Sequence, residues 1–301
     1  MTTFEAVLLG IVQGVFMFVP VSSTSHLALT KHWLISRGAE LPAPESPEMI
    51  LFDLVVHVGT LVSIAIVLRR SLAAYLQRLI VETAPIANLR SFMPWRPNLH
   101  VRLTWLGLLA FFVTGIVGLA LKDFFEQGFA HPIIIAAALI LTGALLWWTD
   151  TFKRQPRGLR QIAPWVAVVI GLAQAAALMP GLSRSGMTIG FGLVCGLKRR
   201  WAAEFSLFLA FPTILAAAAL QALEVAQGDS AQGISAWPLF VGFVVSAAVG
   251  CLALTLVLKL LYRAKFRYFS YYVWALAITV ILWHFFGDAS PVIDPHAGAM
   301  P

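Results

Sequence analysis

The chain has 301 residues, of which 59% are hydrophobic and only 12% are charged, and its mean hydropathy is +0.84. This composition excludes an ordinary soluble domain, because a soluble surface needs many more charged side chains. The net charge of +7 does not indicate nucleic acid, since the basic residues fall between apolar stretches, where membrane topology accounts for them. The sequence predicts an all-α integral membrane protein that binds no nucleic acid.

The apolar stretches follow one another in a repeating order along the chain. Segment 4–36 is broken near its middle by PVSSTSH, and unbroken stretches follow at 50–69, 101–121 and 131–149. Segment 163–197 is broken by MPGLSRSGMT, and further unbroken stretches follow at 203–224, 237–258 and 268–286. Each unbroken stretch can cross the roughly 30 Å of bilayer hydrocarbon as a helix. We therefore expect about six transmembrane helices and two broken segments.

Lys and Arg gather in four of the connecting segments, at 69–102, 153–160, 198–200 and 259–267. The positive-inside rule places these connecting loops on the cytoplasmic side. Both ends of 163–197 lie beside basic clusters, so this segment is expected to enter and leave the membrane from one side as a re-entrant helix-loop-helix hairpin. By the same reasoning, segment 4–36 is expected to form a re-entrant hairpin from the outer side.

Each half of the chain then repeats one plan, a re-entrant hairpin followed by three spans. Because three is an odd number, the second copy is inverted relative to the first. GIVQ at 10–13 resembles GLAQ at 171–174, which supports the repeat. We predict a single membrane domain over 1–301, with inverted halves at about 1–150 and 160–288 and a flexible tail at 289–301. Broken helices in inverted halves predict a binding site where the two tips meet.

The second tip carries Arg184, which needs an anionic partner or a wet cavity inside a bilayer. Its planar guanidinium suits bidentate contact with phosphate or carboxylate. Ser183, Ser185 and Thr188 add hydroxyls. A half-helix expected to start near Gly186 directs free N–H groups to the same place.

The first tip presents Ser22, Ser23, Thr24 and Ser25 at the start of a half-helix, with His26 about one turn in. Taken alone, these hydroxyls are equally well explained as caps of an interrupted helix. The two tips together favour an anion site. A phosphoryl group is the natural anion, because it needs several donors, an in-line nucleophile and a group that moves a proton. Ser23 or a water is the candidate nucleophile, and His26 the acid or base.

Four stretches, VQGVFMFVPVSSTSH, FDLVVHVGTL at 52–61, GLAQAAALMPGLSRSGMT and AAEFSLFLAFP at 202–212, resemble the bacterial undecaprenyl-diphosphate phosphatases, the bacitracin-resistance family. The resemblance runs in order over nearly the whole chain. It implies a multi-pass hydrolase of the bacterial inner membrane that converts undecaprenyl diphosphate to undecaprenyl phosphate, the lipid carrier of peptidoglycan synthesis. Its active site is expected to open to the periplasmic side.

Carried over by position, the resemblance implies specific roles for the tip residues. The catalytic residues are expected to be Ser23, His26 and Arg184. The substrate-binding residues are expected to be Gln13, Ser22, Thr24, Ser183, Ser185 and Thr188.

The chain departs from the family pattern at one position. The family's first motif has Glu or Gln, then three residues, then Glu, whereas this chain has Gln13 and Met17. The resemblance implies a divalent cation such as Mg²⁺ or Ca²⁺, and a thioether cannot replace an oxygen ligand of such an ion. We therefore assign no metal ligands. Asp53 and Glu204 are the acids near apolar helices that could substitute, although Glu204 is better explained as a helix cap. His57 is expected to be a hydrogen-bonded packing residue.

A second function stays open on the sequence alone. A homologue impaired in catalysis would act as a transporter or flippase for undecaprenyl phosphate, because inverted repeats with broken helices are typical of transporters. The expected partners are an isoprenoid diphosphate lipid and the bilayer itself. Self-association as a homodimer is left open.

Overall fold

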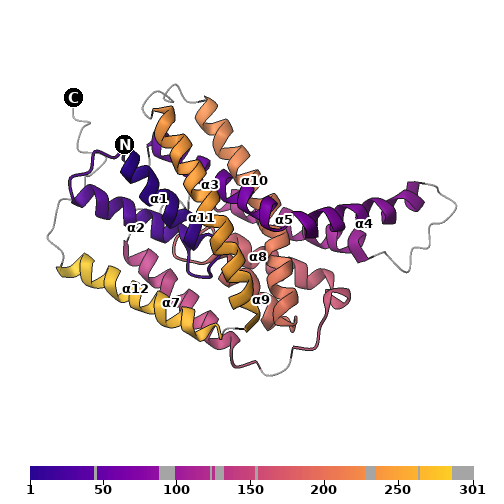
Figure 1. The fold of residues 1–301 in the computed structure, drawn as a ribbon. Helices are drawn as coiled ribbons and strands as arrows, with labels where there is room; N and C mark the ends of the chain where they lie inside the picture. The colour runs from indigo at the N-terminus through magenta and orange to yellow at the C-terminus, as the bar shows by residue number, and fades with distance from the viewer. Residues whose placement is uncertain are drawn as a thin grey trace.

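The structure is a computed structural model that describes residues 1–43, 46–87, 99–122, 124–125, 132–152, 155–227, 235–263 and 265–286. The described chain is helical and contains no β-strand (Figure 1). The predicted tail at 289–301 lies outside the described residues. The elements are α1 (Thr3–Phe16), α2 (Ser23–Ser36), α3 (Pro47–Val67), α4 (Arg69–Ala87), α5 (Leu99–Ala120), α7 (Pro132–Thr149), η1 (Leu159–Gln161), α8 (Pro164–Ala176), α9 (Arg184–Val194), α10 (Arg199–Gln227), α11 (Ala236–Arg263) and α12 (Arg267–Phe286).

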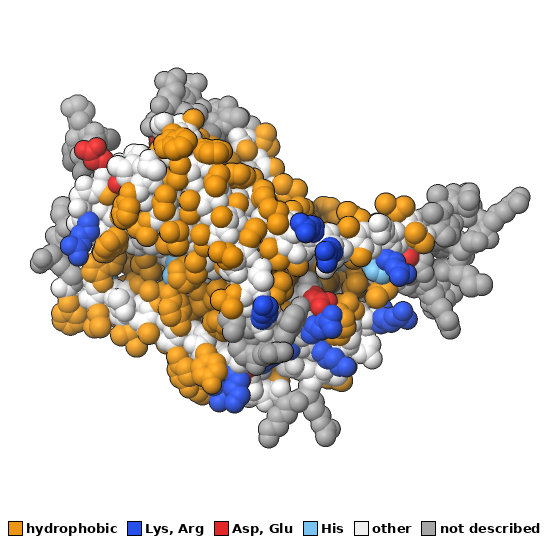
Figure 2. All heavy atoms as spheres, viewed as in Figure 1, with side chains coloured by type: hydrophobic (Ala, Val, Ile, Leu, Met, Phe, Trp, Pro, Cys, Tyr) orange, Lys and Arg blue, Asp and Glu red, His pale blue; other side chains and the backbone are white. Residues whose placement is uncertain are grey.

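Among the described helices, six are long and apolar enough to cross a membrane: α3, α5, α7, α10, α11 and α12. This confirms the prediction of six spans, and the chain is a multi-pass membrane protein. Large apolar side chains on these helices face outward, including Trp105, Phe112, Phe240 and Leu252. The resulting hydrophobic surface dominates the face seen in Figure 2. In lipid this surface needs no cover, and helices satisfy their own backbone hydrogen bonds there.

Residues 69–87 were expected to form part of a basic connecting loop, and the structure shows that this is wrong. They form α4, which packs against α5 and extends beside it (Figure 1). Leu72, Tyr75, Leu79 and Glu82 recur at helical spacing and are half-buried. The Tyr75 hydroxyl lies 2.7 Å from Thr104 Oγ1 on α5. The prediction of a loop relied on the arginines of the segment, whereas the half-buried residues at helical spacing form the face that packs against α5.

The contacts between helices follow the symmetry expected of a repeat. The first short helix of each half packs against the second span of the other half: α1 contacts α11, and α8 contacts α5. In the same way, the first span of each half contacts the second span of the other: α3 contacts α11, and α10 contacts α5. The pairs α3–α10 and α7–α12 also join one half to the other. A Cβ on Gly10 would lie 3.0 Å from a backbone oxygen of α11, and one on Gly171 would lie 2.7 Å from a backbone oxygen of α5. The GIVQ and GLAQ stretches therefore share a glycine because each permits the same close helix approach.

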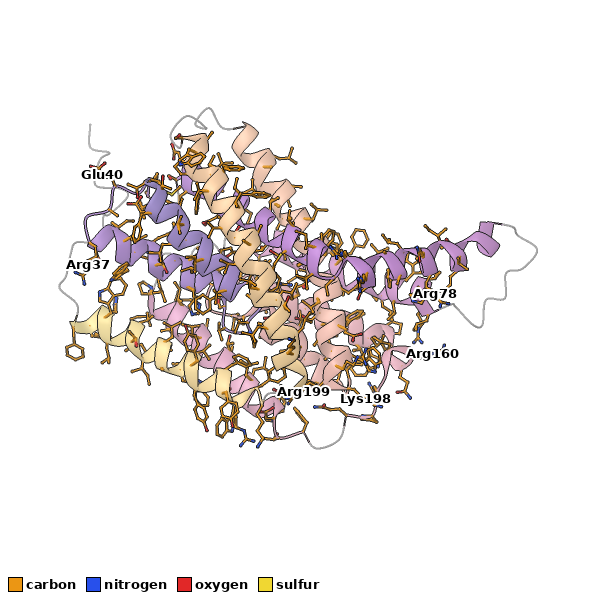
Figure 3. The ribbon with its side chains drawn as sticks, in the orientation of Figure 1. Arg37, Glu40, Arg78, Arg160, Lys198 and Arg199 are labelled. Carbon is orange, nitrogen blue, oxygen red and sulfur yellow. The ribbon has the colours of Figure 1, made fainter. Side chains whose placement is uncertain are left out.

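The charged side chains are distributed unevenly over the molecule. Arg78, Arg160, Lys198 and Arg199 lie on the right and lower side of Figure 3, whereas Arg37 and Glu40 lie on the opposite side. Three of the segments predicted to be cytoplasmic therefore gather on one side of the molecule. The orientation of that side in the cell, the re-entrant path of the two broken segments and the division into inverted halves stay predictions.

Candidate active site

Both broken segments fold as two short helices joined by a tight turn, and the two turns contact each other in the interior. The hydroxyl of Ser185, in the second tip, donates to the carbonyl oxygen of Val19, in the first, at 3.4 Å. Ser183 and Ser185 lie on the same side of the second turn, with their hydroxyl oxygens 3.4 Å apart. The structure therefore brings the hydroxyl-rich turns, which are more than 150 residues apart in sequence, to one point.

The first tip exposes backbone donors because Ser22 does not cap α2. Ser22 adopts a left-handed φ of 68° and makes no capping bond; its hydroxyl instead contacts those of Thr24 and Ser25, at 3.2 and 3.0 Å. In the described protein, no acceptor meets the N–H groups of Ser23, Thr24 or Ser25. A left-handed serine is unfavourable, and it leaves a helix N-terminus open. Such an N-terminus suits an anion, so simple capping does not account for this tip.

The second tip differs, because here a serine does cap the helix. The prediction that a half-helix starts near Gly186 is confirmed: α9 starts at Arg184, and the Ser183 hydroxyl accepts from the Gly186 N–H at 3.1 Å. Ser183 is held in turn by Thr142, whose hydroxyl accepts from the Ser183 N–H at 3.2 Å. The Thr188 hydroxyl lies 2.6 Å from that of Ser206 and donates to the Arg184 carbonyl. Ser183 and Thr188 therefore fix the position of the helix that begins with Arg184.

Arg184 is a cation without a counter-charge in the described protein. The ion pairs among the described residues join other side chains, and the Arg184 guanidinium donates no hydrogen bond to them. A guanidinium in a membrane interior is costly unless an anion or water meets it. Its place at the start of α9, beside the first tip, makes it the natural partner of an anion held by the N–H groups of α2.

Ser23 faces Met17 rather than a base. The Ser23 hydroxyl lies 3.8 Å from the Met17 sulfur, and the Gln13 amide nitrogen donates to the same sulfur at 3.4 Å. The remaining side-chain oxygen of Gln13 is buried and has no partner in the described protein. Met17 is itself buried, with 6% of its surface exposed. The thioether therefore occupies the position where the family pattern has a carboxylate.

His26 is held away from Ser23 in this structure. Its Nδ1 donates to the carbonyl of Ser22 at 2.6 Å, and its Nε2 lies 2.8 Å from the Tyr272 hydroxyl on α12. The ring also stacks on Phe16, with ring centroids 3.8 Å apart. The spacing of three residues permitted a pair between Ser23 and His26, but the Tyr272 contact takes the nitrogen that such a pair would use.

The donor atoms around the first tip do not fit a hard divalent cation. Gln13 offers one bare amide oxygen, Ser23 a hydroxyl and Met17 a thioether, and Mg²⁺ or Ca²⁺ prefers several oxygen ligands that include carboxylates. No three His, Cys, Asp or Glu side chains gather at one place in the described ranges. Glu204 does not supply the missing carboxylate, because it pairs with Arg200 at 2.7 Å on its own helix. We therefore derive no chemical step through a metal.

Three further polar residues form a cluster between α2 and α3. Lys31 on α2 is buried and pairs with Asp53 on α3 at 2.6 Å. His57, one turn beyond Asp53, donates from Nδ1 to the Asp53 carbonyl at 2.7 Å, so its predicted hydrogen bond is confirmed. Lys31 was missed in the sequence, although a lone lysine in the apolar stretch SHLALTKHWLI was a usable signal.

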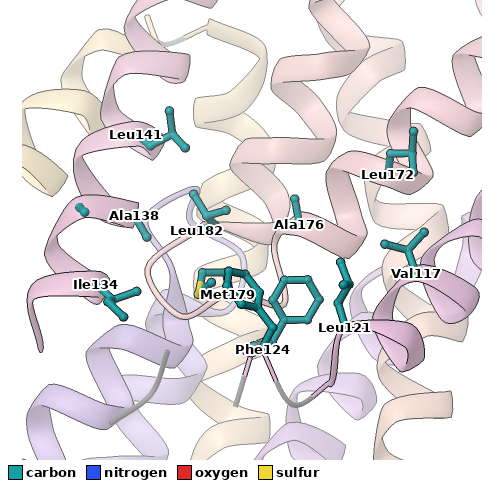
Figure 4. Close-up of a pocket in the computed structure, with 12 residues that line it drawn as sticks. Val117, Leu121, Phe124, Ile134, Ala138, Leu141, Leu172, Ala176, Met179 and Leu182 are labelled. Atoms are coloured by element: carbon teal, nitrogen blue, oxygen red, sulfur yellow. The ribbon is translucent and has the colours of Figure 1, made fainter. Parts of the chain in front are cut away.

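An apolar groove of about 450 Å³ leads to the second tip. It lies between α5, α7 and α8, and two residues of the tip, Met179 and Leu182, form part of its wall (Figure 4). Leu121, Phe124 and Leu141 also line the groove. The groove suits a hydrocarbon chain, because its lining is almost entirely aliphatic and aromatic.

Together, the six apolar helices of the described chain and the two tips that meet inside it define a multi-pass membrane protein. Arg184, which has no partner among the described residues, makes the tips a candidate anion site. The family model described as "Bacitracin resistance protein BacA" matches residues 6–279, and the chain belongs to this family. A relative from Halorhodospira halophila named "Undecaprenyl-diphosphatase" is 56% identical over 94% of this chain and 98% of its own length. Proteins of the same name from Alkalilimnicola ehrlichii and Carboxydothermus hydrogenoformans are 55% and 34% identical, over 93% and 94% of this chain and 96% and 97% of their own lengths. The resemblance found in the sequence is confirmed.

Proposed function

We propose that this protein is an undecaprenyl-diphosphatase, which hydrolyses undecaprenyl diphosphate to undecaprenyl phosphate and inorganic phosphate. The observation that carries the proposal is Arg184, which has no partner among the described residues, beside an open helix N-terminus in a chain whose relatives bear this name. Arg184 and the N–H groups of Ser23, Thr24 and Ser25 would bind the oxygens of the terminal phosphoryl group. These donors also stabilise the charge that develops there during transfer.

The hydroxyl of Ser23 is the proposed nucleophile. Its oxygen forms a bond to the terminal phosphorus while the bond from that phosphorus to the bridging oxygen breaks, and undecaprenyl phosphate leaves. Nε2 of His26 accepts the Ser23 proton after exchanging its contact with Tyr272. A water then attacks the phosphoserine, releasing inorganic phosphate and restoring Ser23. A water that attacks the substrate directly is the alternative nucleophile.

The surroundings of the tips support a lipid substrate. The groove beside Met179 and Leu182 offers a hydrocarbon chain a path from the bilayer to the second tip. We place the protein in the bacterial inner membrane with its site open to the periplasmic side, because the Lys- and Arg-rich segments gather on one side of the molecule. Removal of the terminal phosphate there would recycle the carrier for peptidoglycan synthesis and confer resistance to bacitracin.

The flippase alternative is not favoured. Relatives that share between 34% and 56% of their residues with this chain, over nearly its whole length, are named for the hydrolase. The Met17 substitution that motivated the alternative leaves Ser23, His26 and Arg184 in place.

The test is phosphate release from undecaprenyl diphosphate by the purified protein. We expect turnover by the wild type and by Ser36→Ala, which removes an exposed hydroxyl at the far end of α2. Ser23→Ala should abolish turnover. Absence of phosphate release from well-folded wild-type protein would refute the proposed function, and unchanged turnover by Ser23→Ala would refute the role of Ser23.

A further inference from the structure

The Lys31–Asp53 pair joins the second half of α2 to the first half of α3. Lys31 is eight residues after Ser23, which is about 12 Å along the helix axis. Side chains of a helix lean toward its N-terminus, which for α2 is the first tip. Only 4% of the Lys31 side chain is exposed, whereas 27% of the Asp53 side chain is. The pair therefore combines a buried cation with a partly exposed aspartate side chain.

The hydrogen bonding of this pair is incomplete. Oδ1 of Asp53 is buried and has no partner among the described residues. The Lys31 ammonium has three donors, and its contact in the described protein is the single bond to Asp53 Oδ2. Buried polar groups in folded proteins nearly always find partners. The two unused donors of the Lys31 ammonium are therefore expected to bind an acceptor such as an anionic oxygen.

The charge of the proposed substrate indicates which ligand this is. A diphosphate has two anionic phosphoryl groups, and the tips supply one full positive charge, that of Arg184. Lys31 lies on α2 and Arg184 on α9, and each of these helices begins at one of the two tips that meet. An ammonium with two unused donors is suited to a second phosphoryl group as a point charge.

We infer that Lys31 is a phosphate-binding residue for the lipid-linked phosphoryl group of the substrate, and that Asp53 positions its ammonium before substrate binds. The inference rests on the proposed function. When substrate enters, the ammonium keeps its bond to Asp53 and directs one of its unused donors to a phosphoryl oxygen. Lys31 touches the part of the substrate that stays in the lipid product, so it affects affinity for both the diphosphate and the monophosphate.

The test is a set of steady-state measurements with undecaprenyl diphosphate as substrate and undecaprenyl phosphate or inorganic phosphate as inhibitor. Lys31→Met should raise KM and the inhibition constant of undecaprenyl phosphate together, by roughly tenfold to a hundredfold, as expected for one charge-assisted hydrogen bond. Inhibition by inorganic phosphate should not change. Lys198→Met, at an exposed lysine, is the matched control and should leave all three constants at wild-type values.

A double variant separates phosphate binding from a purely structural role. Lys31→Met alone leaves Asp53 without its partner and could unfold the protein, whereas Lys31→Met with Asp53→Asn removes both charges and preserves stability. We expect the double variant to keep the raised KM at a wild-type melting temperature. A return of KM to the wild-type value in the double variant would overturn the inference. The inference would also be overturned if KM rose in Asp53→Asn as much as in Lys31→Met, because Asp53→Asn retains the Lys31 ammonium. Since every comparison requires an active wild type, failure of this inference is distinct from failure of the proposed function.

Discussion

Replacing Arg184 with methionine should separate activity from stability. The guanidinium makes no ion pair or hydrogen bond within the described protein, so its removal breaks no native contact of the charged group. Methionine is unbranched and apolar and can occupy the space of the arginine stem. Removing an uncompensated cation from a membrane interior also relieves a desolvation cost. The apparent melting temperature should therefore stay constant or rise.

The effect on catalysis should be large. A bidentate contact from Arg184 to a phosphoryl group consists of two charge-assisted hydrogen bonds, which together contribute about 3–6 kcal/mol. Their loss from the transition state lowers kcat/KM by about a hundredfold to ten-thousandfold. Arg184→Lys keeps the charge and loses the fork geometry, so its kcat/KM should fall between those of the wild type and Arg184→Met.

The assay combines phosphate release from undecaprenyl diphosphate with thermal unfolding of the same preparations. Arg78→Met, at an exposed arginine of α4, is the matched control for removal of a guanidinium (Figure 3). The reasoning would be refuted if Arg184→Met retained kcat/KM within a few-fold of wild type. It would equally be refuted if activity and melting temperature fell together, because the guanidinium would then have a structural partner.

Three further predictions concern other groups. Met17→Glu should make phosphate release more sensitive to Mg²⁺ and chelator than Met17→Gln does, since a carboxylate then replaces the sulfur beside Ser23; equal sensitivity would contradict this. His26→Gln should lower kcat by about a hundredfold or more, whereas Tyr272→Phe, which removes only the hydroxyl on Nε2, should stay within a few-fold of wild type. Burial raises the pKa of Glu82, but hydrogen bonds from His100 and a neighbouring N–H outweigh it and lower the pKa overall. The Glu82 carboxylate therefore stabilises the folded protein fully at pH values above its pKa in the unfolded chain, and this stabilisation is lost as pH falls through its lower pKa in the folded protein. Glu82→Gln removes the titrating group, so the melting temperature of this variant should vary less with pH over that acidic range than the melting temperature of the wild type.

Much of the site could be predicted from the sequence because its parts are local. A proline and a run of hydroxyl residues break an apolar stretch visibly, so both tips were found, and Arg184 stands out where a charge is costly. The partners of these residues could not be predicted, because they come from distant segments. Tyr272 holds His26, and Thr142 holds the Ser183 backbone. Nothing in the spacing around either tip indicates which remote hydroxyl will reach it.

The sequence by itself determined the class of structure, because a bilayer requires long apolar helices and their lengths are read directly from hydropathy. It did not determine that 69–87 would be a helix, since that depended on the packing of its periodic face against α5. Only the tertiary structure decided that Met17 contacts Ser23 and that Lys31 meets Asp53. The physical reason is that hydropathy and helix breaks are properties of neighbouring residues, whereas the chemistry of the site depends on which side chains the packed halves bring within a few ångströms of each other.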